Sequence, residues 1–131
     1  MPDTMPKSPT QSLAEEFCSL LKEGKDAEAI DKFYADDVRH VEPFSFDGSS
    51  PVSQGKATIK EAVAKFMQSY EFHSGGVGEP RSNGDQFAVE MWMDCTFKEG
   101  PMAGQRHEMK ETALYTVKDG KISEARFFMG S

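Results

Sequence analysis

The sequence predicts a single α+β domain in which helices come first and strands follow. Apolar residues recur at helical spacing over roughly the first half of the chain, then alternate at a spacing of two from Phe87 onward. Because the two kinds of element are segregated along the chain, we expect an α+β domain with a run of antiparallel strands rather than an alternating α/β domain. A chain of 131 residues is long enough to bury one apolar core without disulfides or metals.

Three helices are expected before the main run of strands. The first begins at Ser12, which has the spacing of a capping box with Glu15, and it ends before Gly24. The second is capped by Asp26 and joined to the first by a tight turn. The third runs from about Lys56 to Tyr70, where apolar residues again recur at helical spacing.

The strands are expected to form hairpins after the third helix. Gly75 and Gly76 interrupt the first strand of this run, and residues 44–54 are expected to be an irregular loop. Asp119 and Gly120 have the chemistry of a tight turn between the last two strands. The expected strands span residues 38–41, 71–81, 87–97, 107–117 and 122–129.

The composition excludes several classes of partner. The formal net charge is −7 and no cluster of Lys or Arg occurs, so neither nucleic acid nor an anionic membrane surface is an expected partner. No apolar run is long enough to cross a membrane. Residues 1–10 hold three prolines and are expected to be a flexible arm, not a signal peptide, before a single domain over 11–131. We expect a cytoplasmic protein.

No motif for a metal or a cofactor is present. Cys18 and Cys95 are the two cysteines, and neither has the spacing of a zinc ligand, so we expect buried reduced thiols. The glycines at 75–78 do not stand between a strand and a helix, as a phosphate-binding loop would require. The expected protein therefore uses neither metal nor cofactor.

Three segments carry a family resemblance. They read FYADDV at 33–38, GKATIKEAVAKF at 55–66 and ETALYTVKDGKISEARFF at 111–128. In these segments the chain resembles the nuclear transport factor 2-like superfamily, and within it the ketosteroid isomerase-like and SnoaL-like groups. The resemblance implies a cone-shaped, cystatin-like curved sheet around a pocket for a small hydrophobic molecule, with three helices packed on it and a homodimer through the outer sheet face.

The same resemblance implies a catalytic base. Glu42, directly before Pro43, matches the position of the isomerases' catalytic aspartate. Their two hydrogen-bond donors, a tyrosine and a protonated aspartate, fall on Cys18 and Ala113 here, so both are missing. One hypothesis is therefore proton abstraction next to a carbonyl, of isomerase, cyclase or dehydratase type. The alternative is a non-catalytic ligand-binding or dimerisation module.

The residues around Glu42 give a reason, independent of the resemblance, to consider Glu42 as a general base. Phe44 and Phe46 suggest an apolar setting that would raise the pKa of Glu42 toward that of a general base, although a solvated loop acid is the alternative. His40, two residues earlier, shares its face and would orient a carboxylate or donate to an oxyanion, or serve only structure. His107 is a second candidate donor, or a solvated rim residue.

The remaining site predictions follow from which face of an element a residue occupies. Residues on the helix side are expected to line the pocket, and large or charged residues on the other side of the sheet are expected to form the dimer interface. The expected pocket residues are Phe17, Cys18, Phe33, Phe44, Phe66, Met91, Met93, Glu111, Ala113, Phe127 and Met129. The expected interface residues are Glu90, Trp92, Arg126 and Phe128.

Overall fold

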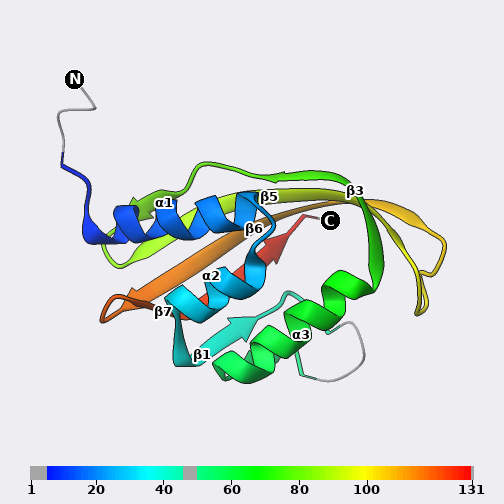
Figure 1. The fold of residues 1–131 in the computed structure, drawn as a ribbon, viewed down its shortest axis with the longest axis horizontal. Helices are drawn as coiled ribbons and strands as arrows, with labels where there is room; N and C mark the ends of the chain where they lie inside the picture. Colours follow the sequence, from blue (N-terminus) through cyan, green and yellow to red (C-terminus); the bar gives the residue numbers. More distant parts are fainter. Residues whose placement is uncertain (1–5, 46–49, 131) are drawn as a thin grey trace.

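The computed structural model describes residues 6–45 and 50–130, in which three helices lie on one side of a curved seven-stranded sheet (Figure 1). The α+β prediction is confirmed. The elements are α1 (Pro9–Lys22), α2 (Asp26–Phe33), β1 (Tyr34–Val41), β2 (Val52–Gln54), α3 (Lys56–Gln68), β3 (Tyr70–Val77), β4 (Arg81–Asn83), β5 (Gln86–Phe97), β6 (Arg106–Lys118) and β7 (Lys121–Met129).

The sheet is mixed rather than purely antiparallel. Its strand order is β2-β1-β7-β6-β5-β3, with the short β4 also paired to β5. Every pair is antiparallel except β1 with β7, which run parallel. Parallel neighbours need a long connection, and here that connection comprises β2, α3 and β3 to β6. The pairing of β6 with β7 ends at Glu111 and Met129, so residues 106–110 of β6 pair only with β5 among the described strands.

The first helix begins earlier than its sequence suggested. Ser8, not Ser12, is the N-cap, and its side chain accepts a hydrogen bond of 3.0 Å from the backbone N–H of Gln11. Pro9 takes the first helical position, where its missing N–H costs nothing and its fixed φ suits the helix. The helix therefore includes Pro9 and Thr10, which were expected to belong to the arm.

The second and third helices also differ from expectation at their ends. Lys25 is the N-cap of α2, and Asp26 is the first helical residue, with no side-chain cap. Tyr34 already belongs to β1, which is therefore four residues longer than the predicted 38–41. α3 ends at Gln68, and Tyr70 opens β3.

The glycines of β3 do not interrupt the strand. β3 pairs with β5 through Gly75 and Gly76, opposite Met93 and Trp92. A Cβ on Gly76 would overlap the indole of Trp92, so the absence of a side chain makes room for that ring. The glycines were expected to break pairing because their backbone is permissive, but here they are needed for packing across the strands.

The predicted turn between β6 and β7 is confirmed. Asp119 has a φ of 52° and Gly120 a φ of 76°. Positive φ at both central residues is the geometry of a type I′ turn, which matches the twist of an antiparallel hairpin. This turn connects β6 to β7, which pair from Lys118 and Lys121 onward.

The core lies between α1, α2 and the sheet. Phe17 of α1 is at its centre, with ring centroids 6.0 Å from Phe33, 6.0 Å from Tyr34, 6.2 Å from Phe87 and 5.1 Å from Tyr115. These aromatic contacts fill the space between α1, α2 and the sheet. Among the described helices, none is both long and apolar enough to span a membrane.

Candidate functional site

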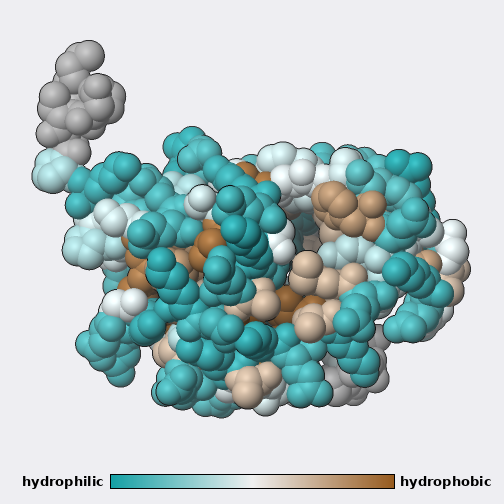
Figure 2. Space-filling view, in the orientation of Figure 1, coloured by the Kyte–Doolittle hydropathy of each residue, from teal (hydrophilic) through white to brown (hydrophobic). Residues whose placement is uncertain are grey.

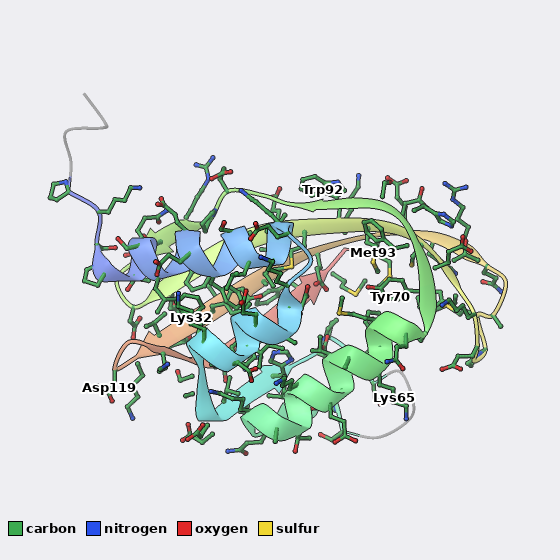
Figure 3. The ribbon with its side chains drawn as sticks, viewed as in Figure 1. Lys32, Lys65, Tyr70, Trp92, Met93 and Asp119 are labelled. Carbon is green, nitrogen blue, oxygen red and sulfur yellow. The ribbon has the colours of Figure 1, made fainter. Side chains whose placement is uncertain are left out.

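The candidate site is the space between the concave face of the sheet and the ends of the helices. Val89 of β5 and Ala113 of β6 belong to the buried core, so residues two or four positions away on each strand face the same side. Figure 2 shows an opening between the α1–α2 turn, α3 and β3, with apolar side chains visible inside it. In Figure 3, Tyr70 and Met93 lie on this helix side and Trp92 lies on the other side of the sheet.

A buried polar pair lies on β1. The Tyr34 hydroxyl is 2.7 Å from His40 Nε2, and the His40 ring packs 5.1 Å from that of Phe127. Burial lowers the pKa of His40 to about 4, so the imidazole is neutral at pH 7. His40 is therefore a fixed, uncharged hydrogen-bonding group, and its Nε2 is already engaged by Tyr34.

Two carboxyl groups face the same space from β1 and β6. Glu42 directly follows β1 and shares the face of the buried His40. Glu111 shares the face of Ala113 on β6. Since β1 and β6 both pair with β7, their backbones are about 10 Å apart, and long side chains can converge across that gap.

The pKa values of these carboxyls are shifted upward. Burial raises the pKa of Glu42. Burial, and after it the nearby charge of Glu42, raises the pKa of Glu111 to about 7. With a pKa of about 7, Glu111 is protonated in a fraction of the molecules at neutral pH and can donate a proton. The neighbouring Glu42 carboxylate can accept one.

A third carboxyl comes from α2. Burial raises the pKa of Asp26. Burial is also the main reason that the pKa values of Tyr34, Tyr70 and Tyr115 are raised, and the negative charge of Asp26 raises all three further. Those phenols come from β1, β3 and β6. The sequence suggested only a helix cap for this residue, and its role in the site was missed.

Tyr115 supplies a hydroxyl to the same space. The residue is 2% exposed, and its ring stacks on Phe87 with centroids 4.7 Å apart. No hydrogen bond joins its hydroxyl to another described residue, yet no fully buried side-chain polar atom of the described residues lacks a partner. The hydroxyl is therefore accessible from the hollow. The alternation of side chains along β6 could have indicated Tyr115 as a site residue. It lies four residues after Glu111 and therefore on the same face of the strand.

The other predicted site residues divide into several groups. Phe17, Cys18, Phe33 and Ala113 are core residues with exposures between 0% and 7%. The partly buried pocket predictions on the concave side are Phe66, Met91, Met93, Phe127 and Met129. Phe44 is 47% exposed, and Phe46 lies outside the described residues.

The structure does not place His107 near Glu42. Its Nε2 lies 3.2 Å from Oε1 of Gln105, and its ring packs 5.6 Å from Phe97, near the β5–β6 hairpin. Its pairing partner is Cys95, beyond the point where β7 ends. No contact among the described residues connects it to the carboxyls.

The opposite face of the sheet carries a groove of about 570 Å³. Trp92 and Phe128 are 48% and 49% exposed there. Of the predicted interface residues, Glu90, Trp92 and Phe128 line this groove, and two of the predicted pocket residues, Met91 and Glu111, line it as well. Arg126 lies 3.9 Å from Glu124, with which it forms an ion pair.

The described residues offer no metal centre. Within residues 6–45 and 50–130, no group of three or more His, Cys, Asp or Glu side chains is arranged to hold a metal ion.

Comparison with known proteins establishes the family. The model of the SnoaL-like domain matches residues 8–129. The chain belongs to the SnoaL-like family. The predicted resemblance to the SnoaL-like group is thereby confirmed. No match is found among curated proteins.

Solved structures agree with this assignment. A protein from Mesorhizobium loti, described as a candidate SnoaL-like polyketide cyclase, is 40% identical, with a TM-score of 0.81 over 89% of this chain and 96% of that one. A cystatin-like protein of unknown function from Xanthomonas campestris is 19% identical, with a TM-score of 0.73 over 93% of this chain and 91% of that one. An NTF2-like protein from Burkholderia xenovorans LB400 is 15% identical, with a TM-score of 0.73 over 96% and 92%. The last two show the fold alone.

Proposed function

We propose that this SnoaL-like protein binds a small hydrophobic carbonyl compound and moves a proton next to the carbonyl, as an isomerase, cyclase or dehydratase does. The observation that supports it is the pair Glu42 and Glu111 facing one apolar hollow, with pKa values raised by burial and with no ion pair to either carboxyl among the described residues. Such a pair can supply a base and an acid at the same pH.

Glu42 acts as the base. Its carboxylate takes the proton from the carbon next to the carbonyl, and the electrons of that C–H bond form the enolate. Protonated Glu111 and the Tyr115 hydroxyl donate hydrogen bonds to the enolate oxygen, which replaces the two donors lost at Cys18 and Ala113. The proton then returns to a second atom of the substrate. His40 positions Tyr34 and carries no charge in this scheme.

The experiment is proton exchange on a model ketone. 2-Tetralone is incubated with the protein in D₂O, and loss of its α-proton signal is followed by NMR. Glu42→Gln is expected to slow the protein-dependent exchange by roughly 10²–10⁴-fold, since it removes the general base. The matched control is Asp94→Asn, which changes a carboxyl on the opposite face of the sheet and is expected to leave the rate unchanged.

Two results would contradict this proposal. Exchange in Glu42→Gln at the wild-type rate removes Glu42 as the base. Binding of the ketone without any exchange above buffer favours the alternative, a non-catalytic ligand-binding member of the family. Circular dichroism of each variant separates either result from a loss of fold.

The homodimer is also a proposal. The half-exposed Trp92 and Phe128 beside a groove on the helix-free face support association of two copies there. Trp92→Ser is expected to shift the molecule toward a monomer in analytical ultracentrifugation, and an unchanged sedimentation coefficient contradicts the interface. A cytoplasmic location is supported by the two free buried thiols, Cys18 and Cys95.

A further inference from the structure

The hydrogen bond between Tyr34 and His40 determines which nitrogen of the imidazole carries the proton. The Tyr34 hydroxyl oxygen is 2.7 Å from His40 Nε2, and the two residues are only 3% and 8% exposed. The described residues offer Tyr34 no second hydrogen-bond partner. If Nε2–H donated to the phenol oxygen, the proton of the phenol would be buried without an acceptor, which is unfavourable. Tyr34 therefore donates, Nε2 accepts, and the neutral ring carries its proton on Nδ1.

The Nδ1–H group of His40 is left without a protein acceptor. It makes no hydrogen bond to another described residue. Because no fully buried side-chain nitrogen or oxygen of the described residues lacks a partner, Nδ1 keeps some accessible surface. The His40 side chain lies on the same face of β1 as the buried Val38, which is the face toward the hollow. A donor left open on a side chain that is more than nine-tenths buried indicates an acceptor on a ligand.

A second open donor, the Tyr115 hydroxyl, lies in the same row of the sheet. His40 and Tyr115 are both paired with Ala125 of β7, one from each side. Neighbouring strands are about 4.8 Å apart, so the backbones of the two residues are about 10 Å apart with only a methyl group between them. In the next row, the Phe127 ring packs 5.1 Å from the His40 ring and 6.3 Å from the Tyr115 ring. Two donors therefore flank one apolar patch of the concave face.

We propose that His40 donates a hydrogen bond from Nδ1–H to the same ligand oxygen as the Tyr115 hydroxyl, and that Tyr34 is the positioning residue that holds the required tautomer. This inference rests on the proposed function, to which it adds a donor from β1. As the carbonyl becomes an enolate, its oxygen gains negative charge, and a donor already held in place stabilises the enolate more than the ketone. His40 transfers no proton in this step and stays neutral.

The first test observes the tautomer directly by NMR. The full chain is labelled with ¹⁵N at histidine, and His40 is identified through its contact with the Phe127 ring. At pH 7, wild-type His40 is expected to have a protonated Nδ1 and an unprotonated Nε2. In Tyr34→Phe, which keeps the ring and removes the hydroxyl, the proton is expected to move to Nε2, as in free histidine. The matched control Tyr70→Phe removes a phenol that packs on Phe66, and it is expected to leave the tautomer unchanged.

The second test adds a ligand to the labelled protein. 2-Tetralone is titrated to saturation, and the Nδ1 resonance of His40 is expected to shift as its N–H finds an acceptor. The Nε2 resonance is expected to change less, because Nε2 keeps its bond to Tyr34. This measurement uses the wild-type protein and needs no catalysis.

Two substitutions of His40 separate the roles of its nitrogens. The amide nitrogen of asparagine can take the place of Nδ1, and that of glutamine the place of Nε2. His40→Gln is expected to lower the kcat of proton exchange on 2-tetralone by roughly 10²–10³-fold, as the loss of one oxyanion donor does, while His40→Asn keeps part of the rate. Tyr34→Phe is expected to lower kcat by roughly tenfold with KM unchanged, because the competent tautomer becomes the minor one. Circular dichroism checks that each variant folds.

Four results overturn the inference. These are a wild-type His40 protonated on Nε2, a Tyr34→Phe variant with the wild-type tautomer, an Nδ1 resonance that does not respond to 2-tetralone, and equal exchange rates in His40→Gln and His40→Asn. Failure of the proposed function has a different signature. In that case exchange is absent or independent of Glu42, while the Nδ1 resonance of the wild type still responds to the ketone.

Discussion

Two carboxyl groups on adjacent strands of this sheet behave in opposite ways because they face opposite sides. Asp94 of β5, on the helix-free face, accepts two hydrogen bonds from Arg106, at 2.9 and 2.8 Å, and these bonds lower its pKa. Glu111 of β6, on the concave face, forms none of the ion pairs among the described residues, and burial, with the charge of Glu42 after it, raises its pKa to about 7.

The comparison shows that position on the sheet, not residue type, decides what an acid can do here. On the outer face, a carboxylate is solvated and paired, so it stays ionised across the physiological range. On the concave face, the charged form is penalised and the proton is held near neutral pH. The two faces of one sheet therefore provide a stable surface charge and a group that exchanges protons.

The largest expected contrast concerns the aromatic side chains of the two faces. Phe17→Ala is expected to cost about 3–5 kcal/mol in the free energy of unfolding, because Phe17 is 1% exposed and contacts four other rings. Phe128→Ser on the outer face is expected to cost less than about 1 kcal/mol, since Phe128 is 49% exposed. Urea unfolding at low protein concentration measures both, and equal losses contradict the assignment of faces.

Glu111→Gln is expected to stabilise the protein at high pH. The folded-state pKa of Glu111 is about 7, above its ordinary value of 4.5, so the wild type loses stability as the pH rises from 4.5 through 7. Glutamine is not subject to this loss, and above pH 7 the variant is expected to be more stable by about 2–3 kcal/mol. Chemical unfolding from pH 4 to pH 8 tests this, and a constant difference between the two proteins contradicts it.

His40→Gln is expected to change how the free energy of unfolding depends on pH in the acidic range. The folded-state pKa of His40 is about 4, below its ordinary value of 6.5, so the unfolded chain takes up a proton first and stability falls as the pH drops from 6.5 to 4. The variant is expected to lose this slope, about 1.4 kcal/mol per pH unit. In the wild type, the slopes of His40 and Glu111 oppose each other between pH 4.5 and 6.5, so only the single variants reveal them.

The smallest expected effect is on the outer face. Asp94→Asn removes the ion pair with the exposed Arg106, and such surface pairs contribute about 0–1 kcal/mol. Urea unfolding at low and at high salt is the measurement, and the small difference from wild type is expected to shrink further in high salt. A loss as large as that of Phe17→Ala would contradict the solvated character of this face.

The periodic elements of the fold could be predicted, and the exceptions have specific causes. The alternation of apolar and polar residues over 87–97 identified β5 and its concave face, because a hydrophobic period of two is typical of a strand with one buried face. The start of α1 was wrong because Ser8 and Ser12 both offer a capping hydroxyl, and the proline at position 9 decides between them. The parallel pairing of β1 with β7 joins two segments far apart in the sequence, which local patterns do not encode.

The site was predicted only where a residue type and its strand face coincided. Glu42 and Glu111 were both expected, one from the resemblance and one from alternation with His107. Asp26 and Tyr115 were missed as site residues, because an acid at a helix start has a sufficient local explanation and a tyrosine in an apolar strand is ordinarily core. How α2, β1 and β6 are placed relative to one another is a tertiary property, which local sequence patterns do not encode.

The end of β7 at Met129 has a further consequence for the behaviour of the protein at high concentration. Residues 106–110 of β6 keep one edge without a described neighbour, and an open edge is a template for growth of intermolecular β-structure. Three of the five side chains there, Arg106, Glu108 and Lys110, are charged and point away from the helices with alternating sign. A strand from another molecule would have to pair against that pattern of charges. These charged side chains therefore disfavour intermolecular β-pairing along this edge.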